Sequence, residues 1–153
     1  MAIDATEMNR RLIALAERPG LRCWRIDYAA LAPPEQVFRS VWEFEAEVNN
    51  GGFEQYFWND SGQLAPHAAA ALRAIGAAQM AAIVEEAVAA LGKDFPWLED
   101  DERQARVTDL PDGTRETLEA LEQRFFSYPD DLTALLYAYV ARHRDAIGAP
   151  AEF

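Results

Sequence analysis

Several residue types that carry chemistry are scarce in this chain of 153 residues. It has one cysteine, Cys23, so no disulfide can form within the chain. Its two histidines, His67 and His143, lie far apart, and neither has a partner at the spacing of a metal site. A phosphate-binding glycine loop and a helical Glu-x-x-His pair are also missing. We therefore expect no cofactor, metal or catalytic site, and we expect Cys23 to be a buried apolar residue rather than a nucleophile.

Basic residues are also few: Lys and Arg number 14, whereas Asp and Glu number 26, which leaves a net charge of −12. Proteins that bind nucleic acids or anionic lipids use clustered Lys and Arg, so the charge argues against both partners. No apolar run approaches the roughly 20 residues that span a bilayer. Residues 1–7 lack the basic and apolar regions of a signal peptide. We expect a cytoplasmic protein.

Apolar residues recur at spacings of three and four along most of the chain, as is typical of amphipathic helices. No run alternates with period two for long enough to predict a strand. Residues 21–31 fit either an extended segment or a short helix, and residues 93–113 are expected to be irregular. The sequence predicts a single all-α domain over residues 1–153, a compact bundle of about seven helices. The expected helices cover residues 8–15 (with Thr6 as cap), 33–50, 53–58, 66–76, 80–91, 118–126 and 132–141, the last with Asp130 and Asp131 in its first turn.

One segment combines glycines, amides and aromatic residues and differs from the rest. We expect it to be a structural corner between two helices. An asparagine can cap one helix, a glycine can supply a positive φ, the aromatic side chains can face the core, and Gln55 and Asn59 can bind the free amides of the corner. The residues of this structural motif are Asn50, Gly51, Gly52, Phe53, Gln55, Tyr56, Phe57 and Asn59.

The alternative for the same segment is a small-ligand pocket or enzyme site at the corner formed by residues 49–59. Its amides would then donate hydrogen bonds to the ligand. Glu45, Glu47 and Glu54 could in principle act as paired carboxylates in acid–base catalysis. Such pairs occur on almost any acidic helix, so we expect the protein not to be an enzyme.

The pattern Asn-Gly-Gly-Phe-x-Gln-Tyr-Phe-x-Asn at residues 50–59 resembles the hallmark of a family of small bacterial all-helical proteins, long labelled a domain of unknown function. Residues 71–77 and the aromatic-rich segments 118–126 and 132–141 are similar to the same family, so the resemblance covers about residues 30–145. It implies an α-helical domain. For the best-known type of the family, it implies an acidic dimer that mimics DNA and occupies the DNA-binding surface of a transcription factor.

The acidic residues are concentrated after residue 77, where 16 acids and 7 bases give a net charge of −9. A helix displays acids three or four residues apart as a row, which could imitate phosphates. Interleaved arginines at 103, 106, 115 and 124 could neutralise much of such a row. The candidate partner-binding residues are Glu99, Asp100, Asp101, Glu102, Asp112, Glu116, Glu119 and Glu122.

These observations predict an acidic module that binds a basic protein surface, such as the DNA-binding surface of a transcription regulator. Exposed aromatic residues such as Trp97 or Phe126 could also pair across a homodimer. The alternative is a soluble helical domain whose acidity serves only solubility.

Overall fold

The computed structural model describes residues 2–153, and this part of the chain contains nine α-helices and no strand. Seven of the helices are at least seven residues long, so the predicted all-α bundle of about seven helices is confirmed. The helices are α1 (Ala5–Ala16), α2 (Arg22–Arg25), α3 (Pro33–Trp58), α4 (Ala65–Ala74), α5 (Ala78–Ala90), α6 (Asp100–Thr108), α7 (Asp112–Phe126), α8 (Leu132–Arg142) and α9 (Arg144–Ile147). Two 3-10 turns, η1 (Tyr28–Ala30) and η2 (Asp60–Leu64), flank α3.

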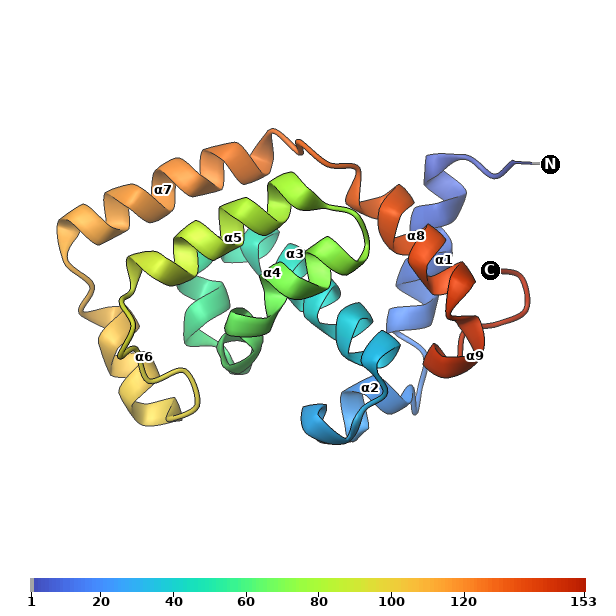
Figure 1. Ribbon diagram of the computed structural model, residues 1–153, viewed down its shortest axis with the longest axis horizontal. Helices are drawn as coiled ribbons and strands as arrows, with labels where there is room; N and C mark the ends of the chain where they lie inside the picture. The colour runs from blue at the N-terminus through green and yellow to red at the C-terminus, as the bar shows by residue number, and fades with distance from the viewer. Residues whose placement is uncertain (1) are drawn as a thin grey trace.

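Helix α3 lies at the centre and contacts α2, α4, α6, α7, α8 and α9. Figure 1 shows α4 and α5 in front of it, α6 and α7 toward one end of the molecule, and α1, α8 and α9 at the other end. The apolar residues at helical spacing along this helix face the core: Phe38, Val41, Phe44 and Val48 are completely buried, whereas Val37 and Trp42 are only partly buried. Both termini lie at the α1 end.

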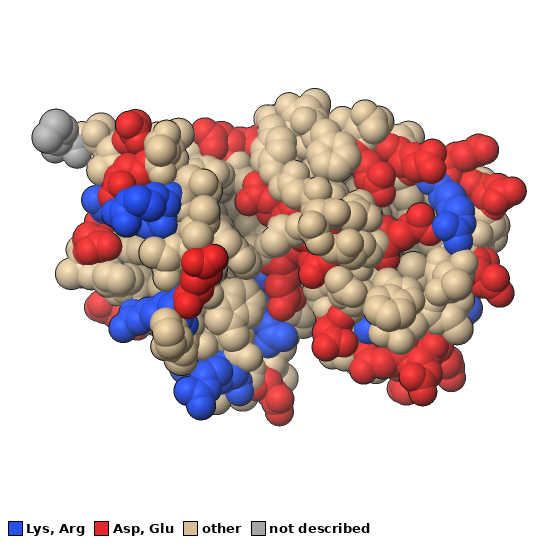
Figure 2. All heavy atoms as spheres, turned by 180° about the vertical axis from the view of Figure 1, so that it is seen from behind, with Lys and Arg blue, Asp and Glu red and all other residues tan. Residues whose placement is uncertain are grey.

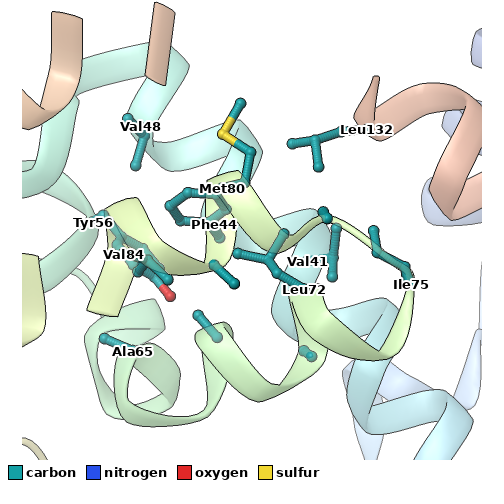
Figure 3. Packing of buried hydrophobic residues seen from close by; sticks show 14 of the residues in the cluster. Val41, Phe44, Val48, Tyr56, Ala65, Leu72, Ile75, Met80, Val84 and Leu132 are labelled. Carbon is teal, nitrogen blue, oxygen red and sulfur yellow. The ribbon is translucent and has the colours of Figure 1, made fainter. Parts of the chain in front are cut away.

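Aromatic side chains form the middle of the core. The ring of Phe44 makes edge-on contacts with Tyr56 and with Phe125 of α7, at centroid distances of 5.7 and 5.3 Å. Figure 3 shows apolar side chains of α4 and α5, including Leu72 and Met80, pointing toward the same region. Full burial of each large side chain contributes about 1.5–3 kcal/mol, so this cluster fixes how α3, α5 and α7 pack.

One helix cap differs from the prediction, and one of the two aspartates before α8 has a different partner. Asp4, not Thr6, caps α1, and its carboxylate accepts the Glu7 N–H at 2.8 Å. Asp131 caps α8 as its predicted position suggests, whereas Asp130 accepts the N–H of Met80 in α5 at 2.8 Å. The turn before α8 therefore supplies a carboxylate to the N-terminus of a helix about 50 positions earlier, which links α5 to α8.

The prediction that residues 93–113 are irregular is wrong over Asp100–Thr108, which form α6, and at residues 112–113, where α7 begins six residues before the predicted helix 118–126. Its buried positions are Arg103 and Val107, four residues apart. An arginine on the inner face hides the apolar periodicity by which a helix is identified from sequence. Phe95 is 5% exposed and anchors the preceding segment, as expected.

The ambiguous segment 21–31 forms α2 and η1. Cys23 is completely buried within α2. Burial raises the pKa of its thiol to about 12, so the side chain stays uncharged near neutral pH and suits a packing role.

Candidate functional site

Helix α3 bends at the two glycines of the motif. Gly51 has φ −157° and ψ 17°, and Gly52 has φ +75° and ψ −172°, so neither is helical. The positive φ predicted for one of them is therefore confirmed at Gly52. The backbone N–H of Phe53, exposed by this bend, donates to the carboxylate of Glu122 in α7 at 2.8 Å. A Cβ on Gly52 would lie 2.3 Å from Oε1 of Glu122, so the close approach requires glycine.

The other motif residues complete the corner. Phe53, Tyr56 and Phe57 are fully buried, as predicted. Gln55 and Asn59 do not bind the corner's backbone amides: both side-chain amides donate to Oε2 of Glu47, each at 2.9 Å. The cap expected from Asn50 is supplied instead by Glu122, and the Asn50 side chain is exposed.

A cavity of about 630 Å³ lies beside this corner. Gln55, Trp58 and Asn59 contribute to its wall together with residues of α6 and α7. Glu54 and Arg115 form an ion pair across it. The motif thus borders a cavity, but the two amides predicted to face a ligand already donate to Glu47.

The candidate partner-binding acids fall into two groups, one at the start of α6 and one along α7. Two of the eight have internal partners: Asp100 pairs with Arg103 at 2.7 Å, and Glu122 binds the Phe53 N–H. The remaining six are exposed and form no ion pair within residues 2–153. These six acids, called the unpaired acids below, are Glu99, Asp101, Glu102, Asp112, Glu116 and Glu119.

The interleaved arginines do not neutralise these acids. Arg103 is fully buried, and Arg106 lies over the ring of Phe95. Arg115 binds Glu54 and two backbone carbonyls, and Arg124 pairs with Glu86 of α5 at 2.6 Å. Each guanidinium therefore has other partners, and none of the four forms an ion pair with an unpaired acid.

The charge is also divided between the two ends of the molecule. Residues 33–131 contain 20 acids and 7 bases, a net charge of −13, whereas residues 1–32 and 132–153 together contain 6 acids and 7 bases. Figure 2 shows most of the basic side chains on the half that holds α1, and acidic groups at the upper and lower edges of the half that holds α6 and α7. The uneven distribution of acidic and basic residues along the sequence therefore corresponds to an uneven distribution of charge over the surface.

The sequence pointed to Glu45 only as a possible catalytic carboxylate, together with Glu47 and Glu54, and not as part of the wall of a second cavity. Glu45 lies on α3, where burial raises the pKa of its carboxyl, and the nearby Asp131 raises it further. A carboxyl whose pKa is higher in the folded than in the unfolded chain contributes to stability below its unfolded pKa. That contribution to the free energy of unfolding is lost as the pH rises through the folded-state pKa. Its anionic form is therefore unfavourable at neutral pH.

Glu45→Gln is expected to raise the melting temperature at pH 7, because it removes this unfavourable charge and keeps an acceptor for a hydrogen bond. The difference in melting temperature between the variant and the parent protein should shrink as the pH falls below about 4.3, where the carboxyl of Glu45 is protonated in the unfolded chain as well. Thermal unfolding followed by circular dichroism from pH 4 to pH 8 measures both effects. A melting temperature that falls equally at every pH would contradict the prediction.

Residues 2–153 contain neither a metal-binding cluster nor a membrane-spanning helix. No cluster of three or more His, Cys, Asp or Glu side chains is arranged to hold a metal ion. Within the same residues, no helix combines the length and the apolar character needed to cross a membrane.

Comparison with curated proteins and with solved structures gives no match. The family model described as DMP19-like protein matches residues 29–143, close to the range over which the sequence resembles its family. That range runs from the turn before α3 to the end of α8 and includes the corner, α6 and α7. Because the match covers well over half of the sequence, this chain belongs to the DMP19-like protein family.

Proposed function

We propose that this protein is an acidic binding module that occupies a basic protein surface, and that the surface is the DNA-binding face of a regulator. The observation that carries the proposal is the set of six unpaired acids on α6 and α7. Nearby arginines have other partners, so this end of the molecule presents uncompensated negative charge. Such a surface attracts a basic partner over long range and raises the association rate.

The spacing of the acids supports DNA mimicry. Asp112, Glu116 and Glu119 follow one another along α7 at intervals of four and three residues, which correspond to rises of about 6 and 4.5 Å. Phosphates along one DNA strand are about 3.4 Å apart in axial rise. The acids of this row are therefore spaced so that one carboxylate would stand for every one or two phosphates. Helix α7 packs against α5 and α3, which holds this row rigidly.

The test is capture of a basic partner from cell lysate by the immobilised protein at low ionic strength. The proposed face is altered in the variant D101N/E102Q/E116Q/E119Q. We expect this variant to bind the captured partner at least about tenfold more weakly, and we expect duplex DNA to release the partner from the parent protein. Binding should also weaken steeply as the salt concentration rises.

The matched control removes four exposed acids from the opposite end in the variant E17Q/D27N/D145N/E152Q. Its net charge changes by the same amount, so it separates position from total charge. Equal loss of binding in both variants would show attraction by net charge alone. Recovery of no basic partner at low ionic strength would overturn the proposal.

A second candidate function is binding of a small polar ligand in the cavity of about 630 Å³ beside the motif. The double variant Gln55→Ala and Asn59→Ala tests it. If the corner is scaffolding, removing both hydrogen bonds to Glu47 lowers the free energy of unfolding by about 1.5–3 kcal/mol per bond and leaves partner binding unchanged. A stably folded double variant that has lost a metabolite carried by the parent protein would support the ligand site instead.

A further inference from the structure

A separate cavity of about 400 Å³ lies where the middle of α3 meets the turn between α7 and α8. Its wall includes Trp42, Glu45 and Asn49 of α3, Asn9 of α1 and Tyr128 of the turn. It is distinct from the unpaired acids and from the motif cavity, which lie on α6, α7 and the second half of α3. Figure 2 shows acidic groups along the middle of the molecule as well as at its charged end.

The carboxylate in this cavity has no cationic partner. Oε2 of Glu45 accepts the hydroxyl of Tyr128 at 2.9 Å. Oε1 accepts no hydrogen bond within residues 2–153 and is not among the buried atoms that lack a partner, so it is exposed to solvent. The nearby charge is that of Asp131, which is also negative. A partly buried carboxylate beside a second acid favours occupation of the cavity by a cation.

Tyr128 has an unusual backbone conformation. It is the one non-glycine residue with positive φ within residues 2–153, at +48°. It directly follows the last residues of α7, a position where glycine is common because other side chains are strained there. The strain places the phenol in the cavity, where its hydroxyl accepts from Nδ2 of Asn49 at 2.6 Å and donates to Glu45. The hydroxyl thus positions the carboxylate of Glu45.

Two aromatic rings line the same cavity. The ring of Trp42 stacks on Phe38 at a centroid distance of 5.9 Å, and the Tyr128 side chain is 40% exposed. Aromatic faces attract cations, and arginine is the cation found most often on them because its planar guanidinium stacks and also donates hydrogen bonds to a carboxylate. The combination of two rings, one free carboxylate oxygen and the polar side chains of Asn9 and Asn49 in the wall suits a guanidinium better than a metal ion, which requires more oxygen ligands.

We infer that this cavity binds an arginine side chain of the basic partner and provides the specific contact that long-range charge attraction cannot provide. The inference rests on the proposed function, since the arginine belongs to the protein that the acidic end attracts. Charge on α6 and α7 governs encounter, whereas the cavity at Glu45 selects a partner with an arginine at the matching place.

The test is an NMR titration with two capped tripeptides, acetyl-Gly-Arg-Gly-amide and the same peptide with neutral citrulline in place of arginine. We expect the arginine peptide to produce saturable shifts, at millimolar concentration, in the indole N–H of Trp42 and the side-chain amide of Asn49. The citrulline peptide should bind at least about tenfold more weakly, because it keeps the shape and lacks the charge.

Three variants show whether the peptide binds in this cavity or elsewhere on the protein. Glu45→Gln should abolish the shifts, whereas Glu119→Gln, which makes the same charge change at an unpaired acid on α7, should retain them. Tyr128→Gly should weaken binding at least tenfold while circular dichroism shows a folded protein, because glycine adopts the positive φ without strain, which offsets part of the lost contact between the ring and Phe125. This result would separate a binding role of the ring from a structural one.

Shifts confined to residues of α6 and α7, with the cavity unaffected, would overturn the inference and leave the proposed function standing. The absence of any shift with the arginine peptide would also overturn it, while capture of the partner from lysate would still decide the proposed function. Equal binding by Glu45→Gln and the parent protein would likewise exclude the cavity as the site.

Discussion

Replacing Arg103 by methionine is expected to lower the free energy of unfolding by about 3–5 kcal/mol. Its side chain is completely buried, and its guanidinium donates to the carbonyls of Phe57 and Trp97 at 2.9 Å and of Asn59 at 3.2 Å. Two of these carbonyls belong to the C-terminal end of α3, where the helix dipole favours a positive charge. Methionine would fill much of the space but would remove the guanidinium donors to the carbonyls of Phe57 and Trp97 and the ion pair with Asp100, whereas the carbonyl of Asn59 keeps the N–H of Gly62.

Urea unfolding followed by circular dichroism measures the loss. Arg106→Met is the matched control, because Arg106 is exposed on the same helix one turn later and lies over the ring of Phe95. It should cost no more than about 1 kcal/mol. Arg103→Lys should recover only part of the stability, since an ammonium group cannot reach several carbonyls at once. Equal effects of the two methionine variants would show that the buried guanidinium is not what holds α6 to α3.

Arg103 also explains why α6 could not be predicted from the sequence. The long helices α3 and α5 were predicted because their inner faces repeat valine, leucine, isoleucine and phenylalanine at helical spacing. In α6 the inner face has Arg103 and Val107, and the surrounding residues are mostly charged. The arginine is buried because it meets carbonyls about 46 positions earlier in the chain, and such a long-range contact leaves no local pattern.

The corner at residues 49–59 was likewise predicted only in its local features and not in its long-range contacts. Its bend, its positive φ and its buried aromatic residues were predicted, because glycine and aromatic spacing act locally. The hydrogen-bond partners of its polar groups were not predicted. Glu122 shares a row of acids with Asp112, Glu116 and Glu119, so sequence periodicity treats the four alike, yet Glu122 alone of these binds the backbone of α3. The distinction depends on how α7 packs against α3, which the spacing of acids does not specify.

Gly52→Ala is expected to destabilise the fold by about 3 kcal/mol, and a glycine series within the same chain separates the causes. Gly113 lies in α7 with open space around it, so alanine there should stabilise by about 0.5–1 kcal/mol through helix propensity. Gly92 has φ +93° and open space, so alanine there should cost about 1 kcal/mol from backbone strain alone. Gly52 combines a positive φ with an extended ψ of −172°, a region that is essentially restricted to glycine, so alanine there carries more backbone strain and in addition a clash with the carboxylate of Glu122.

The clash matters because that carboxylate cannot move without releasing the Phe53 N–H. Losing a hydrogen bond to a charged acceptor costs about 1.5–3 kcal/mol, which is the part of the cost of Gly52→Ala that we assign to the carboxylate. A double-mutant cycle with Glu122→Ala tests this cause: without the carboxylate, Gly52→Ala should cost less by about this amount and retain only the backbone strain. Additive effects of the two changes would mean that the bend tolerates a Cβ next to Glu122. A coupling of about 2 kcal/mol would establish that Glu122 stabilises the corner through this bond, so that the row on α7 offers a partner three carboxylates rather than four.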